Sequence, residues 1–204
     1  MNLPFGAKAY FCAIIDCMKI SKQIIFTLIV LCVLAATYRV IPNRPWGFAP
    51  QMAMAIFSGA LFVNNKKWAF ALPLLSMFLS DALYQILYKA GYSAVPGFYK
   101  GQLLNYALFV GITVIGFLVH MRKPIQIGLA AIASPFIYFL ASNSLVWFGG
   151  GGFGRPKTWE GYLLCLNDGV PFLKGGLMAT VLFSAVLFGG YAWLTQSKKQ
   201  TNLA

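Results

Sequence analysis

The stretch SDALYQILY, Ser80–Tyr88, decides the fold class because it places a carboxylate inside a long apolar run. Asp81 is one of only four acidic residues in 204, and the run around it extends from Trp68 to Tyr88. At ~1.5 Å per helical residue, a run of this length crosses a hydrocarbon core of about 30 Å. An ionised side chain at such a depth costs about 2.5–3.5 kcal/mol, so it faces a partner or a cavity rather than lipid.

The composition of the whole chain is that of a membrane protein. Apolar residues make up 59% of it and charged residues 10%, and the mean hydropathy is +0.72. Soluble domains average about 25% charged residues. The net charge is +12, but Lys and Arg stand in small groups between apolar runs, which is the pattern that flanks membrane helices. Nucleic acid is therefore excluded as a partner, and membrane lipids are expected to surround the chain.

Six apolar runs predict an all-α polytopic membrane protein, a bundle of six transmembrane helices over residues 24–195. The expected spans are 24–41, 48–63, 68–88, 102–119, 125–148 and 175–195. The second run is short, so Pro50 at its start and burial by its neighbours are expected to help it. Strands are a poor alternative, because the runs do not alternate with period two and open sheet edges cannot face lipid.

The basic residues predict that both termini are cytoplasmic. With a cytoplasmic N-terminus, nine Lys and Arg residues flank the inner side and seven the outer side. The inner loops are short and purely basic, as the positive-inside rule requires. Residues 1–23 are expected to be a cytoplasmic or interfacial segment, since Lys8, Asp16 and Lys19 interrupt any signal-peptide core. Residues 196–204 form the expected cytoplasmic tail.

The longest outer segment, residues 149–174, carries a glycine run and a candidate short helix. Thr158 is expected to cap a helix that ends near Cys165, after which Asn-Asp-Gly turns the chain towards Pro171. One interpretation is a lid hinged at the glycines, with Trp159 or Tyr162 directed towards the opening of a site. The other is a fixed interfacial helix whose Trp159 lies among lipid headgroups.

Polar side chains gather in the outer half of the predicted bundle. Asp81 lies ~20 Å above the inner end of its span and Arg39 lies ~22 Å up its own. Further polar and aromatic residues share the faces and depth of these two. The candidate substrate-binding residues are therefore Arg39, Asp81, Tyr84, Tyr88, Asn105, Tyr106, Asn143, Trp147 and Trp159.

Two interpretations of Asp81 follow from this placement. In the first, Asp81 forms a buried structural pair with Arg39 or caps a neighbouring backbone. In the second, it belongs to a pocket that opens outwards. Tyr, Trp and amide side chains in such a pocket suit a ring-bearing, partly polar small molecule, such as a vitamin.

Four long stretches carry a resemblance to a known family. They are RVIPNRPWGFAPQMAMAIFSGALF, LPLLSMFLSD, SNSLVWF and RPKTWEGYLLCLNDGVPFLKGGLMATVLFSAVLFG. In order and spacing they resemble small uncharacterised bacterial membrane proteins, which are similar to the substrate-binding S-components of energy-coupling-factor vitamin transporters. The resemblance implies an S-component-like bundle in the bacterial inner membrane with an outward-facing site. It also implies an energising transporter module as a partner and cobalamin as one candidate substrate, with Cys165 as a conceivable cobalt ligand.

The sequence gives little support to catalysis. His120 is the only histidine, so HExxH metal sites and Ser-His pairs are excluded, and no catalytic residue, metal site or cofactor is expected. The resulting prediction is a non-enzymatic protein that binds and takes up a small vitamin-like molecule. The alternative is a structural or accessory subunit of a larger membrane complex, since small residues such as Ala55, Gly59, Gly111 and Gly116 allow close helix contacts.

Overall fold

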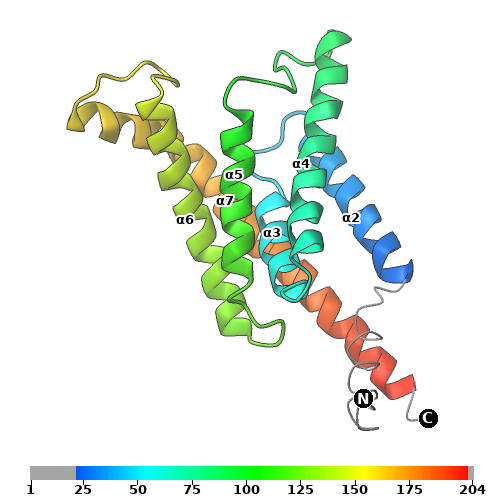
Figure 1. The fold of residues 1–204 in the computed structure, drawn as a ribbon. Helices are drawn as coiled ribbons and strands as arrows, with labels where there is room; N and C mark the ends of the chain where they lie inside the picture. The colour runs from blue at the N-terminus through cyan, green and yellow to red at the C-terminus, as the bar shows by residue number, and fades with distance from the viewer. Residues whose placement is uncertain (1–21, 202–204) are drawn as a thin grey trace, which may run out of the picture.

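The computed structural model describes residues 22–201 and the side chains of residues 29–196. Most of the segment predicted over residues 1–23 lies outside this range. The described chain forms helices α2 (Lys22–Arg39), α3 (Gln51–Leu61), α4 (Lys66–Lys89), α5 (Gln102–Gly116), α6 (Pro124–Phe148) and α7 (Trp159–Thr201). Successive helices run in opposite directions through one bundle (Figure 1). The predicted all-α class is therefore confirmed for the described residues.

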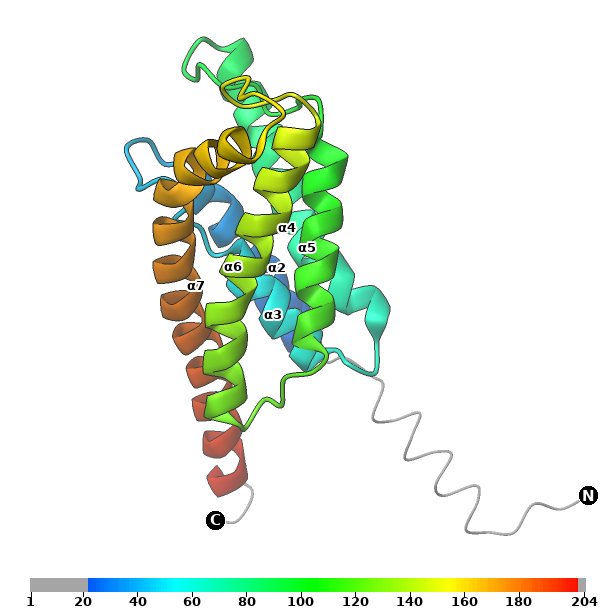
Figure 2. The ribbon, with the colours of Figure 1, turned by 90° about the vertical axis from the view of Figure 1, so that its left-hand side faces the viewer.

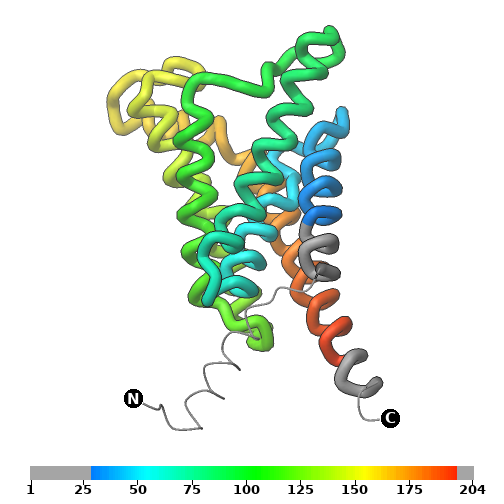
Figure 3. Tube along the Cα trace, turned by 45° about the vertical axis from the view of Figure 1, so that its right-hand side comes forward, coloured from blue at the N-terminus to red at the C-terminus, as the bar shows by residue number. Residues whose placement is uncertain are grey.

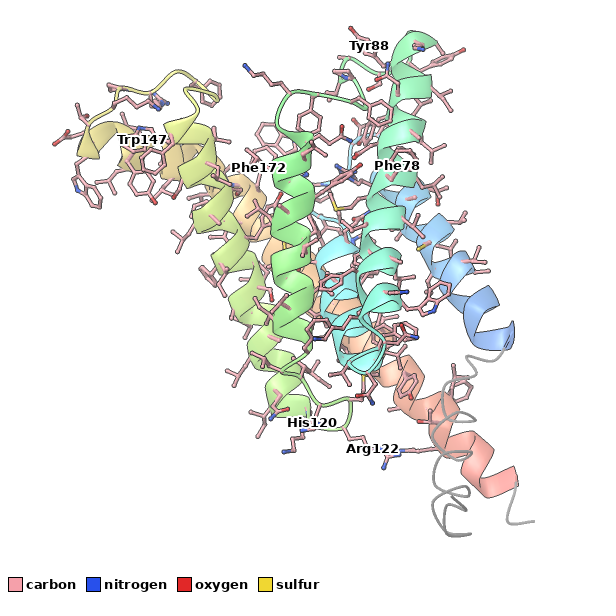
Figure 4. The ribbon with its side chains drawn as sticks, in the orientation of Figure 1. Phe78, Tyr88, His120, Arg122, Trp147 and Phe172 are labelled. Carbon is pink, nitrogen blue, oxygen red and sulfur yellow. The ribbon has the colours of Figure 1, made fainter. Side chains whose placement is uncertain are left out.

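The bundle has two chemically different ends. Tyr88 and Trp147 lie at one end, and His120 and Arg122 lie at the other (Figure 4). We call these the Trp147 end and the His120 end. The start of the described chain and the last turn of α7 are both on the side of the His120 end (Figure 2). The acidic residues of the described chain lie towards the Trp147 end. Asp81 contacts Gln102 in the first turn of α5, and Glu160 and Asp168 lie in the first turns of α7, which pack on Trp147.

Three of the helices are long and apolar enough to cross a membrane. They are α4, α6 and the part of α7 from Trp159 to Gln196, with mean hydropathies of 1.5, 1.7 and 1.8. Helices α2, α3 and α5 are also apolar but shorter. Many large apolar side chains of all these helices are exposed, including Leu103 and Ile125 at 81% and 78%. The chain therefore has the character of a membrane protein, whose outer apolar surface suits lipid.

Helix α3 differs from the predicted second span. A span over residues 48–63 is expected from the sequence, but α3 has 11 residues and is ~16 Å long. The turn at Gly47, with φ +73°, and Pro50 at the N-cap delay its start. Its other end stops at Phe62. Nine of its residues are buried, because α4, α5, α6 and α7 all pack against it. It is the central core of the bundle rather than a lipid-facing span.

Small residues let α3 and α5 approach closely. A Cβ atom added to Gly59 would overlap the carbonyl oxygen of Thr113, and one added to Gly116 would overlap that of Ile56. Around this crossing lies the main apolar core, which includes Ile56, Phe57, Met77, Phe109, Ile112 and Phe188. The close contact therefore fixes the spacing of the two helices that carry much of the core.

Helix α7 corrects the prediction for residues 149–174. A separate short helix and an Asn-Asp-Gly turn are expected there, but the helix that begins at Trp159 continues to Thr201. Asp168 is held by Arg155, and Gly169 packs against the Asn143 amide, so packing overrides the turn signal. Pro171 lacks an N–H and removes one helical hydrogen bond. The helix changes direction near there, between its gold and orange parts (Figure 2). We call Trp159–Val170 the arm.

We predict that alanine at Gly59 or Gly116 destabilises the protein by about 1–3 kcal/mol, because each new Cβ would force the helices apart. Unfolding with SDS in mixed micelles measures this change. Gly111→Ala is the control, since Gly111 lies on the same helix as Gly116 and an added Cβ meets no atom within 4 Å. It should be neutral or slightly stabilising. Equal effects at Gly59, Gly111 and Gly116 would contradict the close contact.

Candidate functional site

The site is built on an ion pair between α2 and α4. Arg39, the last residue of α2, donates from Nη1 to Asp81 Oδ1 at 2.5 Å and to Ser80 Oγ at 2.6 Å. Asp81 is 2% exposed, and the side chain of Arg39 is 19% exposed. The two charges thus lie inside the bundle, where removing either partner would leave the other uncompensated. The predicted Arg39–Asp81 pair is therefore present in the structure.

A second set of donors completes the shell of Asp81. Its Oδ2 accepts hydrogen bonds from Gln102 Nε2 and Tyr106 Oη, both at 2.7 Å. These two residues lie one turn apart at the start of α5. The carboxylate therefore joins α2, α4 and α5, and its negative charge is shared among three donors. Such sharing is what makes a buried carboxylate tolerable.

The loops at the Trp147 end are hydrogen-bonded to Arg39 and to the residues of α4 near Asp81. Tyr84 Oη donates to the Arg39 carbonyl at 2.7 Å, and Arg44 Nε donates to that carbonyl at 2.8 Å. Residues 90–101 cross from α4 to α5 (Figure 3). There, Gln85 Oε1 accepts from the backbone N–H groups of Gly97 and Phe98. A Cβ on Gly97 would overlap the Asp81 carbonyl oxygen, so the loop lies directly against α4.

A cavity of about 240 Å³ lies beside the ion pair. Its wall is formed by α3, α4, α5, α6 and α7, by Arg39 at the end of α2, and by the loop between α2 and α3. The polar lining residues are Arg39, Arg44, Gln51, Asn105, Tyr138, Ser142 and Asn143. The apolar lining includes Met52, Met77, Phe109, Phe139 and Phe172. The cavity thus combines a large apolar and aromatic surface with a few polar groups, as ligand sites do.

Three of the predicted site residues line the cavity, and three lie behind its wall. Arg39, Asn105 and Asn143 are lining residues. Asn105 is oriented by its Oδ1, which accepts from Tyr138 Oη at 2.5 Å. Asp81, Tyr84 and Tyr106 hold Arg39 and its surroundings through the hydrogen bonds above. The structure therefore brings six of the nine predicted residues into one connected region.

The other three predicted residues lie elsewhere. Tyr88 is 45% exposed at the far tip of α4. Trp147 packs on Tyr162 of the arm, with ring centroids 5.3 Å apart, and donates from Nε1 to the Pro156 carbonyl. Trp159 is 67% exposed. The depth of a residue in its predicted span could not exclude these three residues from the site. Depth does not fix the rotation of each helix about its axis or the direction of the arm.

The arm is tied to its surroundings rather than hinged over the cavity. Thr158 caps it, accepting from the Gly161 N–H at 3.2 Å, as the sequence predicts. Arg155 pairs with both carboxylate oxygens of Asp168 at 2.8 and 2.9 Å. Tyr162 Oη lies 2.9 Å from Ser144 Oγ. Trp159 is exposed and packs on Tyr162. These contacts hold the arm in one position, and the lid stays a prediction.

Sequence reasoning missed Gln51, Arg44 and Tyr138 as lining residues. Gln51 is 2% exposed, its Nε2 donates to the Ala35 carbonyl at 3.2 Å, and its Oε1 has no donor among the described residues. The signal was available, since an amide directly after a proline at the start of an apolar run raises the same question as Asp81. Arg44 gave no such signal, because it lies in a loop.

The described residues offer the cavity few ionisable groups. In the described part of the chain no group of three or more His, Cys, Asp or Glu side chains is placed to hold a metal ion. Cys165 donates to the Asn143 carbonyl at 3.7 Å and does not line the cavity. Arg155 lies outside the helices, and its hydrogen bonds to Asp168 raise its pKa. The lining groups are hydrogen-bond donors and acceptors, a fixed positive charge and aromatic rings.

We predict that Asp81→Asn lowers the free energy of unfolding by about 3–5 kcal/mol, because it leaves the Arg39 guanidinium buried without its counter-charge. SDS unfolding of the purified variant measures this change. The double variant Arg39→Met/Asp81→Asn should regain most of the loss, since no charge then remains unpaired.

Asp168→Asn is the comparison variant for this prediction, because it removes the carboxylate of the Arg155–Asp168 pair, whose side chains are 33% and 21% exposed. Ion pairs that are open to solvent contribute less than buried ones, so this variant should lose clearly less stability than Asp81→Asn does. The account of the buried pair is wrong if Asp81→Asn and Asp168→Asn have equal effects.

Comparison with known proteins gives one match. No curated protein and no solved structure matches the chain. The model of a family described as a family of unknown function (DUF6580) matches residues 19–203. These residues include all the described helices, so the match covers the cavity and the ion pair together. The chain belongs to this family of unknown function, DUF6580.

Proposed function

We propose that this protein is a membrane-embedded binding protein that takes up a small ring-bearing molecule through the cavity beside Arg39. The observation that carries the proposal is the cavity itself, a space of about 240 Å³ with aromatic walls and a few oriented polar groups. Pockets for drug-sized ligands measure about 300–1,000 Å³, so the preferred ligand has about one ring. The proposal involves binding and passage without a chemical step.

The proposed setting is a bacterial inner membrane that the chain crosses six times. The alternating helix directions place both ends of the described chain at the His120 end (Figure 1). That end is rich in Lys and Arg without described acidic residues, which supports a cytoplasmic location. The cavity would then open to the outside. Helix α3, at ~16 Å, would cross with its neighbours covering it, as short spans do inside a protein.

The resemblance to S-components supports the class of function but not every substrate of that class. S-components bind vitamins from the outer side, which agrees with the proposed direction of opening. Cobalamin is disfavoured, because a corrin macrocycle is large for this cavity and Cys165 does not reach it. An energising module, or another membrane subunit, remains a proposed partner whose docking surface would lie on the exposed helix faces.

Filling the cavity tests the proposal. Gly176 on α7 lines the cavity, and a Cβ there meets only ordinary contacts, Gly47 O and Met52 Cε at 3.8 Å. We predict that Gly176→Leu leaves the protein folded but prevents retention of a small molecule, because its side chain enters the cavity. Mass spectrometry of compounds released from the purified protein measures retention.

The control is Gly189→Leu, on the same helix at a position where an added Cβ meets nothing within 4 Å. Wild type and Gly189→Leu should release the same compound, and Gly176→Leu should release none. If no variant releases a compound and a partner chain copurifies instead, the uptake proposal fails and the accessory-subunit alternative replaces it.

A further inference from the structure

The residues that line the cavity carry a net positive charge. Arg39 and Arg44 both line the cavity, whereas Asp81 lies behind Arg39. The ion pairs of the described residues are Arg39–Asp81 and Arg155–Asp168. Arg44 therefore has no carboxylate partner there. Two guanidinium groups line the space, and only that of Arg39 is paired with a carboxylate. A ligand with one negative charge would balance the wall.

Both guanidinium groups are fixed by hydrogen bonds, and each keeps N–H donors that these bonds do not use. Arg44 donates from Nε to the Arg39 carbonyl and from Nη1 to the Phe48 carbonyl at 3.0 Å. Arg39 is fixed through Nη1. Among the described residues, the Nη2 groups of both arginines have no hydrogen-bond acceptor. Planar guanidinium groups whose orientation is already fixed are well suited to bind a carboxylate.

A buried hydrogen-bond acceptor on a lining residue has no donor, and a donor group on the ligand would pair with it. Gln51 Oε1 is unpaired on a residue that is 2% exposed and lines the cavity. Its Nε2 is engaged with the Ala35 carbonyl, which fixes the amide. Buried oxygen atoms without a donor are costly and rare. An O–H or N–H group on the ligand would satisfy this one.

The apolar lining of the cavity indicates which scaffold the ligand has. Phe109 and Phe139 line the cavity together with Met52 and Met77, and such rings and thioethers pack well on a flat ring. We infer that the cavity takes a small ring-bearing carboxylate with a hydrogen-bond donor, its carboxylate on Arg44 and Arg39 and its donor on Gln51. This inference rests on the proposed function and names the chemical class of its substrate.

Ligand-observed NMR on the detergent-purified full chain, first freed of copurified compounds, tests the inference with 3- and 4-hydroxybenzoate. Benzoate lacks the donor, and the matching hydroxybenzamides lack the charge at nearly the same shape. At least one hydroxybenzoate should bind about ten-fold more tightly than its amide, since a charge-assisted hydrogen bond is lost. It should also bind more tightly than benzoate.

Three variants locate the two contacts. Arg44→Gln should weaken hydroxybenzoate about ten-fold without weakening the amide. Gln51→Leu should remove the difference between hydroxybenzoate and benzoate. Lys100→Gln removes a basic residue that is exposed and does not line the cavity, so it should change neither affinity.

The outcomes separate this inference from the proposed function. If the amides bind as tightly as the acids, or if neither hydroxybenzoate binds while wild type still releases a compound that Gly176→Leu does not, the carboxylate inference is overturned and the uptake proposal stands. If no probe binds and no compound is released, both are overturned.

Discussion

The buried ion pair between Arg39 and Asp81 is the constraint on which the half of the bundle at the Trp147 end depends. A lone charge would be expensive in this apolar interior, so Asp81 receives donors from α2 and α5, and the Arg39 guanidinium has acceptors on α4. Gln102 and Tyr106 bring α5 to Asp81, and Tyr84 and Arg44 bring α4 and the α2–α3 loop to the Arg39 carbonyl. Satisfying one pair of charges thereby positions three helices and a loop around a common space.

The same arrangement explains why a cavity exists beside the pair. Around the crossing of α3 and α5, Gly59 and Gly116 let the helices touch, and apolar side chains fill the space between them. Around Arg39 the long polar side chains hold the elements apart, and Gln51, whose Oε1 is unpaired, is among the residues that line the gap. The structural and the functional interpretations of Asp81 are therefore compatible, because the pair that stabilises the fold also forms the back of the cavity wall.

The sequence predicted much of this from depth and periodicity, and it failed where tertiary packing decides. The Arg39–Asp81 pair follows from two charges at equal depth in an apolar chain, and Tyr106 follows from its place one turn after Gln102. The length of helix α3 was overestimated, because apolar composition does not show that Pro50 and the turn at Gly47 shorten the helix. Asn167-Asp168-Gly169 predicted a turn, but Arg155 and Asn143 hold this segment in the helix. Trp147 and Trp159 were misplaced because sequence spacing does not fix how the arm lies.

We propose that the cavity beside Arg39 is open to the outer side of the membrane and takes a ligand. Chemical labelling of Ser142→Cys, at a lining residue of α6, tests it most directly in a background without native cysteines. A membrane-impermeant maleimide should label this cysteine in intact cells, and 4-hydroxybenzoate, or 3-hydroxybenzoate if that isomer binds, should slow the reaction. Labelling only after the cells are opened, or a rate that no bound molecule changes, would contradict the account.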